Sequence, residues 1–268
     1  MRINNNLAAI NSHRQYNINN GNIGKNVEKL SSGFRVNRAA DDAAGLAISE
    51  KMRTQIRGLN QASRNSQDGI SLVQTAEGAM QTAHNIMQRM RELAVQSRNG
   101  TNDTAVDRAA LQLEFSQLNS EISQIAETVK FNDMEIFGNT NFLVFTIQSG
   151  ANAADFTTFS VAQLGAITGV SIGAQDDAAT AIDRLTQEIN DLSSNRAQLG
   201  AIQNRLEFKI QNLDNSAENL SAAESRIRDV DMAKQMTEFT KNNILFQAST
   251  AMLAQANALP QGVLQLLG

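Results

Sequence analysis

Proline is nearly absent from this chain: the 268 residues contain a single one, Pro260, and neither cysteine nor tryptophan. A proline inside a helix costs roughly 3 kcal/mol, so its absence from the preceding sequence leaves room for long uninterrupted helices. Without cysteine, the chain can form neither disulfides nor a thiolate metal site. Aromatic residues make up only 4%, which suits long, narrow helices better than a thick sandwich core.

Long apolar runs are also missing. No run approaches the roughly 18 residues of a membrane span, and the N-terminal segment MRINNNLAAINSHRQ lacks the apolar core of a signal peptide. We therefore expect a soluble chain that, if it leaves the cell, is exported without a cleaved signal peptide. The net charge of −4 argues against a general nucleic-acid binder.

Charge is unevenly distributed along the chain. Residues 1–100 hold 13 basic and 7 acidic side chains, a balance of +6, whereas residues 101–268 hold 10 and 20, a balance of −10. Opposite charge favours contact between the two parts, either within one chain or between copies.

Five helices are predicted, over residues 2–32, 43–97, 105–130, 176–226 and about 230–258. The first has an incomplete apolar stripe among many asparagines, which are poor helix formers, so the terminal arms would struggle to fold alone. Gly33 is expected to end the first helix. The polar stretch RNGTNDT at 98–104 is a predicted turn.

The three middle helices carry apolar residues in the alternating spacing of four and three that is typical of packed helices. In 43–97 and 105–130 these are Leu72, Ala76, Ala79, Ala83, Ile86, Met90 and Leu93, followed by Leu111, Phe115, Leu118, Ile122, Ile125 and Val129. In 176–226, leucines recur every seventh residue as a coiled-coil seam: Leu185, Leu192, Leu199, Leu206, Leu213 and Leu220, with Ile227 continuing it.

Residues 131–175 differ in kind, because they hold six of the eleven phenylalanines and two alternating, β-prone segments. NFLVFTIQSG and DFTTFSVAQLG predict a small β-hairpin with its turn in SGANAAD. The predicted fold class is therefore mainly α: a long, coiled-coil-like helical hairpin or bundle with one small β-hairpin region, in which the chain folds back and pairs its N- and C-terminal helices.

Residues for catalysis or cofactor binding are not evident. The two histidines, His13 and His84, have no partner within a helical turn, and no phosphate-loop, dinucleotide or hydrolase motif occurs. The acid pairs Asp41/Asp42, Asp176/Asp177 and Asp229/Asp231 each precede a predicted helix, where a carboxylate caps free N–H groups. We predict no enzyme activity, cofactor or metal, and a self-associating structural protein.

The same residues carry a resemblance to a known family. MRINNNLAAIN, the stretch NVEKLSSGFRVNRAADDAAGLAISEKM and MQRMRELAVQS resemble the N-terminal region of bacterial flagellin. LGAIQNRLEFKIQNL, NLSAAESRIRDVDMAKQMTEFTKNNILFQASTAMLAQAN and PQGVLQLL resemble its C-terminal region. The resemblance covers about 1–140 and 180–268.

This resemblance implies a structural subunit that polymerises into the bacterial flagellar filament. Residues 1–42 plus 228–268 would be the terminal arms, usually called D0, and 43–227 the helical rod D1, including the β-region 131–175, without outer domains. The junction between them would include Gly33, Asp41, Asp42 and Gly45, with small residues that let backbones approach closely.

The resemblance also implies partners and a location: other copies of the chain, an export chaperone, a filament cap and hook-junction proteins, and an extracellular flagellum reached by the flagellar type III apparatus. Host Toll-like receptor 5 reads many flagellins through positions that match Arg89, Leu93 and Glu114. No nucleic-acid or membrane partner is expected.

Two alternatives stay open at this point. A hook–filament junction protein shares the terminal-helix plan, although such proteins usually carry a proline after the acid pair, where this chain has Ala43. A coiled-coil scaffold unrelated to motility would fit the seams but not the motifs.

Overall fold

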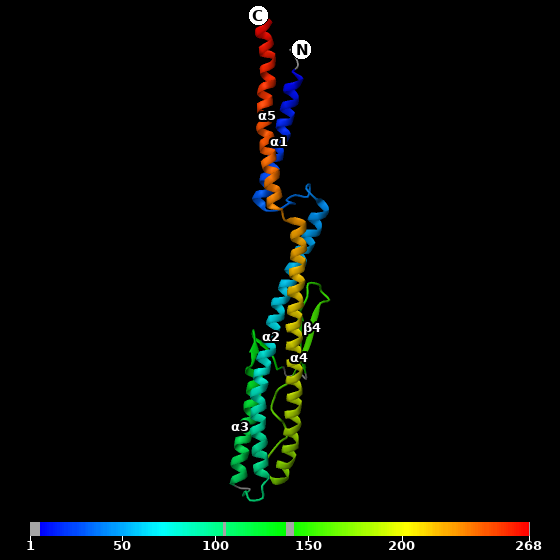
Figure 1. The fold of residues 1–268 in the computed structure, drawn as a ribbon. Coiled ribbons are helices and arrows are strands. Elements are labelled where there is room, and N and C mark those ends of the chain that lie inside the picture. Colours follow the sequence, from blue (N-terminus) through cyan, green and yellow to red (C-terminus); the bar gives the residue numbers. More distant parts are fainter. Residues whose placement is uncertain (1–5, 104–105, 138–141, 268) are drawn as a thin grey trace. The chain divides into compact units, whose positions relative to one another are not determined.

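The computed structural model describes residues 6–103, 106–137 and 142–267 (Figure 1). Its helices are α1 (Leu7–Ser32), α2 (Ala43–Arg98), α3 (Asp107–Thr128), α4 (Gln175–Arg228) and α5 (Met232–Leu267). The strands are β1 (Lys130–Phe131), β2 (Met134–Glu135), β3 (Phe142–Gln148) and β4 (Phe156–Ala162). The predicted mainly α fold is confirmed. The last helix runs past the predicted end near 258 and includes Pro260 in its backbone.

Contacts divide the chain into two compact units, which are described separately below. One comprises residues 1–56 and 218–268, and contains α1, α5 and the two connectors that join them to the neighbouring helices. The other comprises residues 57–217 and contains most of α2 and α4 together with α3 and the strands.

The first helix ends where the sequence predicts, but it begins at Leu7 and not at residue 2, with Asn6 as its N-cap, and residues 1–5 lie outside the described part of the chain. The side chain of Asn6 accepts a hydrogen bond from the Ala9 amide at 3.1 Å, which satisfies one of the free donors of the first turn. Gly33 adopts a left-handed conformation with φ of 73°, and its N–H donates to the Lys29 carbonyl. A left-handed residue costs glycine little, which explains why the helix stops there.

Two of the three acid pairs supply a helix cap. Asp42 accepts from the Gly45 amide at 2.8 Å, just before α2, and Asp231 accepts from the Lys234 amide at 3.1 Å, just before α5. The expectation for Asp176 and Asp177 was wrong in detail. Helix α4 begins one residue earlier, at Gln175, so both acids lie inside its first turn. There they still interact favourably with the helix dipole.

The predicted hairpin consists of β3 and β4, paired antiparallel with Phe145 opposite Phe159. The turn lies in residues 149–155, where the amide of Ser149 donates to the carbonyl of Asp155. A second hairpin, β1–β2, was missed. Its turn residues Asn132 and Asp133 have φ of 50° and 62°. Positive φ at both positions is the hairpin turn that asparagine and aspartate tolerate best, so the Asn-Asp pair was the available signal.

In the second unit, α2, α3 and α4 enclose one apolar core. The predicted α2 residues are buried, except that Ile86 is only half-buried. The buried stripe is wider than predicted, because a third heptad row, Val73, Met80, Met87 and Ala94, is buried too. Helix α2 contacts both α3 and α4, through Arg89–Glu114 and Arg196–Glu77 ion pairs at its margins. A helix with two neighbours needs a broader apolar face than a two-helix seam.

On α3 and α4, the residues of the predicted seams are buried to different degrees. Phe115, Ile122, Leu185, Leu192, Leu199, Leu206 and Leu213 are buried, whereas Leu111, Leu118 and Leu220 are half-buried. After β4, the segment 163–174 adds Leu164, Ile167 and Ile172 to the same core. Asn119 on α3 fixes this segment, because its side chain donates to the Ile167 carbonyl and accepts from the Ile167 amide.

Two glycines in the interior of α2 are explained by the β3–β4 hairpin. A Cβ on Gly69 would lie 2.1 Å from the Ile147 Cδ1 atom, and one on Gly58 would lie 2.9 Å from the Ala151 Cβ atom. Glycine costs about 1 kcal/mol relative to alanine inside a helix, and here it allows the hairpin to pack closely against the helix. Gly78 has no such neighbour, and the structure gives no account of it.

Candidate assembly interface

Helices α1 and α5 lie side by side and run antiparallel (Figure 1). Three contacts fix their register. The side chain of Asn6 donates to the Ala256 carbonyl at 2.7 Å, that of Asn19 to Ser249 Oγ at 2.7 Å, and that of Gln235 to Asn26 Oδ1 at 2.8 Å. The predicted pairing of the terminal helices is thus present.

The seam between the two arms is unusually polar. In α1 the buried residues are Asn19 and Asn26, exposed by 3% and 7%. In α5 they include Gln235 and Ser249, at 8% each. Tyr16 and Phe246 meet in the same seam, with ring centres 4.9 Å apart. Burying an amide costs free energy unless it is hydrogen-bonded. Asn19 donates to Ser249, and Asn26 accepts from Gln235, but the Nδ2 atom of Asn26 has no hydrogen-bond partner among the described residues. The seam therefore gives the arms a specific register but little apolar burial.

The apolar side chains of the arms are instead exposed. In α1 these are Leu7 (65%), Ile10 (59%), Ile18 (48%) and Val27 (48%), and in α5 Met232, Met236, Ile244 (61%), Leu245 and Met252 (62%). Leu7, Ile10 and Ile18 recur at spacings of three and eight residues, which places them on one side of the helix. Single exposed apolar residues need no explanation. A stable helix pair, however, buries its apolar side chains between the helices and exposes polar ones, and this pair does the opposite. The arms therefore carry surface that a further helix would cover.

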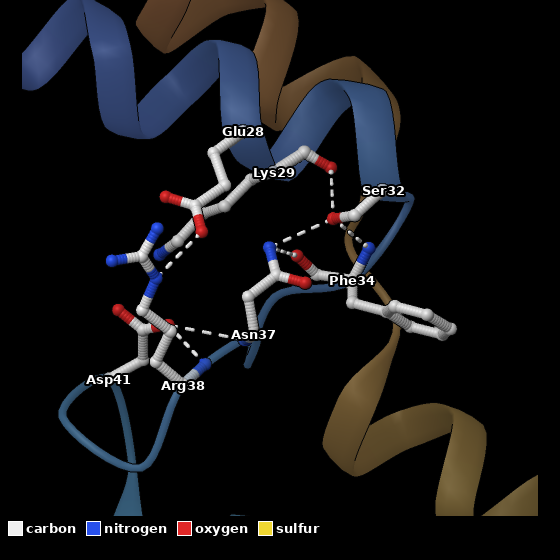
Figure 2. A network of polar contacts seen from close by, with 7 residues as sticks. All are labelled: Glu28, Lys29, Ser32, Phe34, Asn37, Arg38 and Asp41. Atoms are coloured by element: carbon white, nitrogen blue, oxygen red, sulfur yellow. Dashed lines mark hydrogen bonds and ion pairs between the residues drawn. The ribbon is translucent and has the colours of Figure 1, made fainter.

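The first connector, residues 33–42, is tightly hydrogen-bonded (Figure 2). The carboxylate of Asp41 accepts from the amides of Asn37 and Arg38 at 3.1 and 3.0 Å. These two hydrogen bonds lower the pKa of Asp41 below its ordinary value. The side chain of Asn37 donates to Ser32 Oγ, and Arg38 pairs with Glu28 at 2.9 Å.

The second connector, residues 229–231, is bonded to the first. Phe34 and Asp229 form an isolated antiparallel bridge. The Val230 amide donates to the Gly33 carbonyl and the Arg35 amide to the Arg228 carbonyl. The two connectors thus fix each other by backbone hydrogen bonds, and a change in one must displace the other.

Arg228 links this pair of connectors to the start of α2. Its guanidinium carbon lies 4.8 Å from the centre of the Phe34 ring, and its Nη1 atom lies 2.7 Å from Glu50 Oε1. The ion pair lowers the pKa of Glu50. The arginine side chain is mostly buried, so this contact is better shielded from solvent than an ordinary surface pair.

The predicted junction residues each have a place in this arrangement. Gly33 ends α1, Asp41 fixes the connector turn, and Asp42 caps α2. Gly45 is buried, and a Cβ there would lie 2.3 Å from Asp42 Oδ2. Glycine at 45 therefore leaves room for the Asp42 carboxylate to reach the helix amides. Sequence reasoning left open which of the two aspartates caps the helix, and the structure assigns that role to Asp42.

The three residues matched to receptor recognition do not form one exposed surface. Arg89 and Glu114 are exposed and paired at 2.9 Å, and Glu92 also contacts Arg89. Hydrogen bonds to these carboxylates raise the pKa of Arg89. Leu93, in contrast, is 1% exposed within the apolar core. In this chain the leucine supports the helix beneath the ion pair and is not itself accessible.

Sites for metal or small-molecule chemistry are not found in the part of the chain that the structure describes: no three His, Cys, Asp or Glu side chains gather there. A shallow groove of about 540 Å³ runs between α4 and the segment after β4, lined by Glu188, Asp191 and Gln163 among others. None of the described helices is both long and apolar enough to cross a membrane.

Comparison with known proteins covers both ends of the chain. Residues 3–142 match the family described as bacterial flagellin N-terminal helical region, and 182–267 match bacterial flagellin C-terminal helical region. The chain is similar to a flagellin of Halalkalibacterium halodurans, with 56% identity over 273 aligned positions, and to a flagellin of Bacillus subtilis, with 51% over 303. It is also similar to the flagellar filament 31.3 kDa core protein of Treponema maltophilum, with 48% over 286.

Each of these alignments spans 100% of both proteins. The two family matches fall on the helices that form the arm pair and the bundle, and leave only 143–181 between them. The chain belongs to the bacterial flagellin family.

Proposed function

We propose that this chain is a structural subunit that polymerises into the bacterial flagellar filament. The observation that carries the proposal is the arm pair, with a polar seam inside and apolar side chains outside. Burying a large apolar side chain stabilises an assembly by about 1.5–3 kcal/mol, and the arms offer at least nine of them. Copies of the chain that cover each other's arms would gain this free energy.

The names of the relatives support the same role. They are called flagellin or flagellar filament core protein, which favours a filament subunit over a hook–filament junction protein. As a member of this family, the chain is a structural protein and not an enzyme. Its place is the extracellular flagellum.

The domain division stays a prediction. We assign residues 1–42 plus 228–268 to the arms (D0) and 43–227 to the rod (D1), without outer domains. The compact units divide later than predicted at the first boundary, at 56/57, and earlier than predicted at the second, at 217/218. The ion pair of Arg228 with Glu50 and the hydrogen bond of Ser49 to Glu224 tie the start of α2 and the end of α4 to the connectors, which accounts for the difference.

Seeded polymerisation of the full-length chain tests the function. Purified subunits, in which we expect arms 1–40 and 230–268 to be poorly ordered, should form tubular filaments with seeds or precipitating salt, as seen by electron microscopy. A chain lacking both arms should stay monomeric while its remaining helices unfold cooperatively. If the full-length chain forms no filament under any of these conditions, the proposal is wrong.

Further partners follow from family membership alone. We propose that the chain is exported through the flagellar type III apparatus without a cleaved signal peptide, held by an export chaperone, and guided into place by a filament cap next to hook-junction proteins. The exposed apolar residues of α5 offer a chaperone a binding surface, because an unassembled arm would otherwise present them to water. A pull-down of chaperone by the full chain, lost on removal of α5, would test this.

Receptor recognition is a second candidate role, supported by the exposed Arg89–Glu114 pair. We propose that Toll-like receptor 5 contacts this pair, while buried Leu93 holds the helix in position. Arg89→Ala should then weaken receptor activation without changing the unfolding midpoint, whereas Leu93→Ala should change both. Full activation by Arg89→Ala would exclude the pair as a contact.

A further inference from the structure

The loop between α2 and α3 contains the dipeptide Asn99-Gly100, exposed at the end of a 56-residue helix. We infer that Asn99 is a site of spontaneous deamidation and isomerisation. The reaction needs no enzyme and no partner beyond water. It converts this asparagine into a mixture of aspartate and isoaspartate.

The chemistry takes place within two residues. The backbone nitrogen of Gly100 attacks the side-chain carbon Cγ of Asn99, so that an N–C bond forms. The bond from Cγ to the side-chain nitrogen breaks, and ammonia leaves with the proton from Gly100. Water then adds to one of the two carbonyl carbons of the five-membered ring and breaks its bond to the nitrogen. Addition at Cγ gives aspartate, and addition at the former backbone carbonyl gives isoaspartate.

The local structure leaves the attacking nitrogen available. Among the hydrogen bonds of the described residues, none is donated by the Gly100 amide, although the Asn99 amide donates to the Gln96 carbonyl in the last turn of α2 and the Asn102 amide to the Asn99 carbonyl. Gly100 lies in a turn, and apart from its two chain neighbours no described side chain or backbone lies within 4 Å of its Cβ position. A glycine in open space can rotate toward the side chain before it, because no Cβ hinders it.

The electrophile is also held in place. The amide of Thr101 points to Asn99 Oδ1 at 3.4 Å, an orientation that draws electron density away from the attacked carbon. No hydrogen bond in the described part of the chain holds the Asn99 side-chain nitrogen, which is the leaving group.

Two other dipeptides of the same kind provide contrast. Asn20-Gly21 lies within α1, and Asp68-Gly69 within α2. Inside a helix, each backbone N–H donates to the carbonyl four residues earlier, and the fixed dihedral angles hold it away from the preceding side chain. Gly69 is in addition covered by Ile147. The fold therefore leaves one of these three dipeptides reactive.

Arg108 gives the isoaspartate product a specific partner. This arginine is buried, and it donates from Nε to the Ser97 carbonyl at 3.0 Å and from Nη2 to the Asn99 carbonyl at 3.2 Å. In isoaspartate, the former backbone carbonyl of residue 99 becomes a free carboxylate. The acceptor of the Arg108 hydrogen bond thereby gains a negative charge, and a charge-assisted bond is roughly twice as strong as a neutral one.

Each modified subunit carries one additional negative charge on this loop. A long-lived assembly has no way to replace the residue, so modified loops accumulate with the age of the filament. The inference does not depend on polymerisation, because the loop lies within the unit formed by residues 57–217.

Ageing of the full-length chain at neutral pH and moderate temperature tests the inference. Peptide mapping by mass spectrometry would follow deamidation at Asn99 and isomerisation at Asp68, which lies inside α2 of the bundle, in native and in urea-denatured samples, with an isoaspartate-specific methyltransferase to count isoaspartate. We expect Asn99 to react at a similar rate in both samples, and Asp68 to react chiefly in the denatured one. Native Asn99 that is protected relative to denatured Asn99 to the same degree as Asp68 overturns the inference.

Gly100→Ala is the matched variant. Position 100 has open space for a Cβ, so this variant should keep the fold and the unfolding midpoint while modification of Asn99 slows severalfold. An unchanged rate in a folded Gly100→Ala chain would exclude attack by the residue 100 nitrogen. Arg108 is tested by the product ratio: if native samples give no more isoaspartate relative to aspartate than denatured samples, the arginine does not stabilise it.

Discussion

The two helical regions of this chain distribute their apolar residues in opposite ways. In the bundle of α2, α3 and α4, residues such as Phe115, Ile122 and Leu185 are at most 1% exposed and form a continuous core. In the arm pair of α1 and α5, the buried positions include Asn19 and Asn26, while Leu7 and Ile10 are more than half exposed.

This difference separates folding from assembly. We expect the bundle to be stable by itself, because burial of apolar surface is the main favourable term in folding. The arms have a seam that fixes register through amide hydrogen bonds, each worth only about 0.5–1.5 kcal/mol net. Their stability must come from surfaces of other copies, which links order in the arms to polymerisation.

The largest effect on stability is expected from a cavity in the core of the bundle. Phe115→Ala should lower the free energy of unfolding by about 3–5 kcal/mol, because it removes transfer free energy and leaves a cavity. Urea unfolding followed by circular dichroism measures it. Leu113→Ala, two residues away at a position 64% exposed, is the matched control and should change little. Equal losses in both variants would mean that the α3 core is not where the structure places it.

A charge on the outside of an arm should have a smaller effect, and on a different property. Ile18→Asp should raise the critical concentration for polymerisation by more than about tenfold, since burial of an isoleucine is worth about 1.5–3 kcal/mol. The unfolding midpoint of the bundle should not move. Sedimentation of polymer from monomer measures the change. Asn22→Asp, which adds the same charge at another exposed position of α1, should polymerise nearly as the parent chain does, and failure of both variants would point to charge alone.

Removal of the helix cap at the start of α2 should lower the local stability of the helix by about 1 kcal/mol. Asp42→Ala removes the helix cap and should reduce protection of the first α2 amides from hydrogen exchange about fivefold. Gly45→Ala should displace the same carboxylate, but the better helix propensity of alanine, about 1 kcal/mol, offsets the lost cap. The global unfolding midpoint of Gly45→Ala should therefore stay close to that of the parent. Unchanged exchange in Asp42→Ala would contradict the assigned cap.

The smallest expected effect is the pH response of the first connector. Hydrogen bonds from Asn37 and Arg38 lower the pKa of Asp41 in the folded chain. Because the folded pKa lies below the unfolded one, the contribution to stability is present above the ordinary aspartate range, near pH 4, and is lost as pH falls through the folded pKa. The amide shifts of Asn37 and Arg38 in NMR spectra should titrate below that range. Asp41→Asn should remove this titration, and persistence of the same titration would assign it to another group.

Much of the fold follows from local sequence signals. The heptad leucines of α4 and the left-handed Gly33 predict a helix face and a helix end, because both depend on a few neighbouring residues. The Asp42 and Asp231 caps follow from the same local chemistry. The third buried row of α2, represented by Val73 and Met80, was not predicted, since it depends on α2 having two helical neighbours.

The candidate assembly surface was predicted only in part. The weak stripe of α1 indicated that the arms are not self-sufficient, but not that Asn19 and Asn26 would be the buried residues. Leu93 carried two predictions. The spacing of four and three placed it on the packed face of the helix, where it is 1% exposed, whereas the family resemblance matched it to receptor recognition, which burial does not favour.

By itself the sequence determined where the helices form and that α1 ends at Gly33, because helix propensity, capping and heptad spacing act within a few residues. Its motifs also determined which family the chain belongs to. Only the tertiary structure decided which faces are covered, that Gly58 and Gly69 accommodate a hairpin, and that two connectors hydrogen-bond to each other. These features depend on residues up to 200 positions apart, such as Gly33 and Val230. Whether a side chain is buried is set by what lies opposite it, and the local sequence does not contain that information.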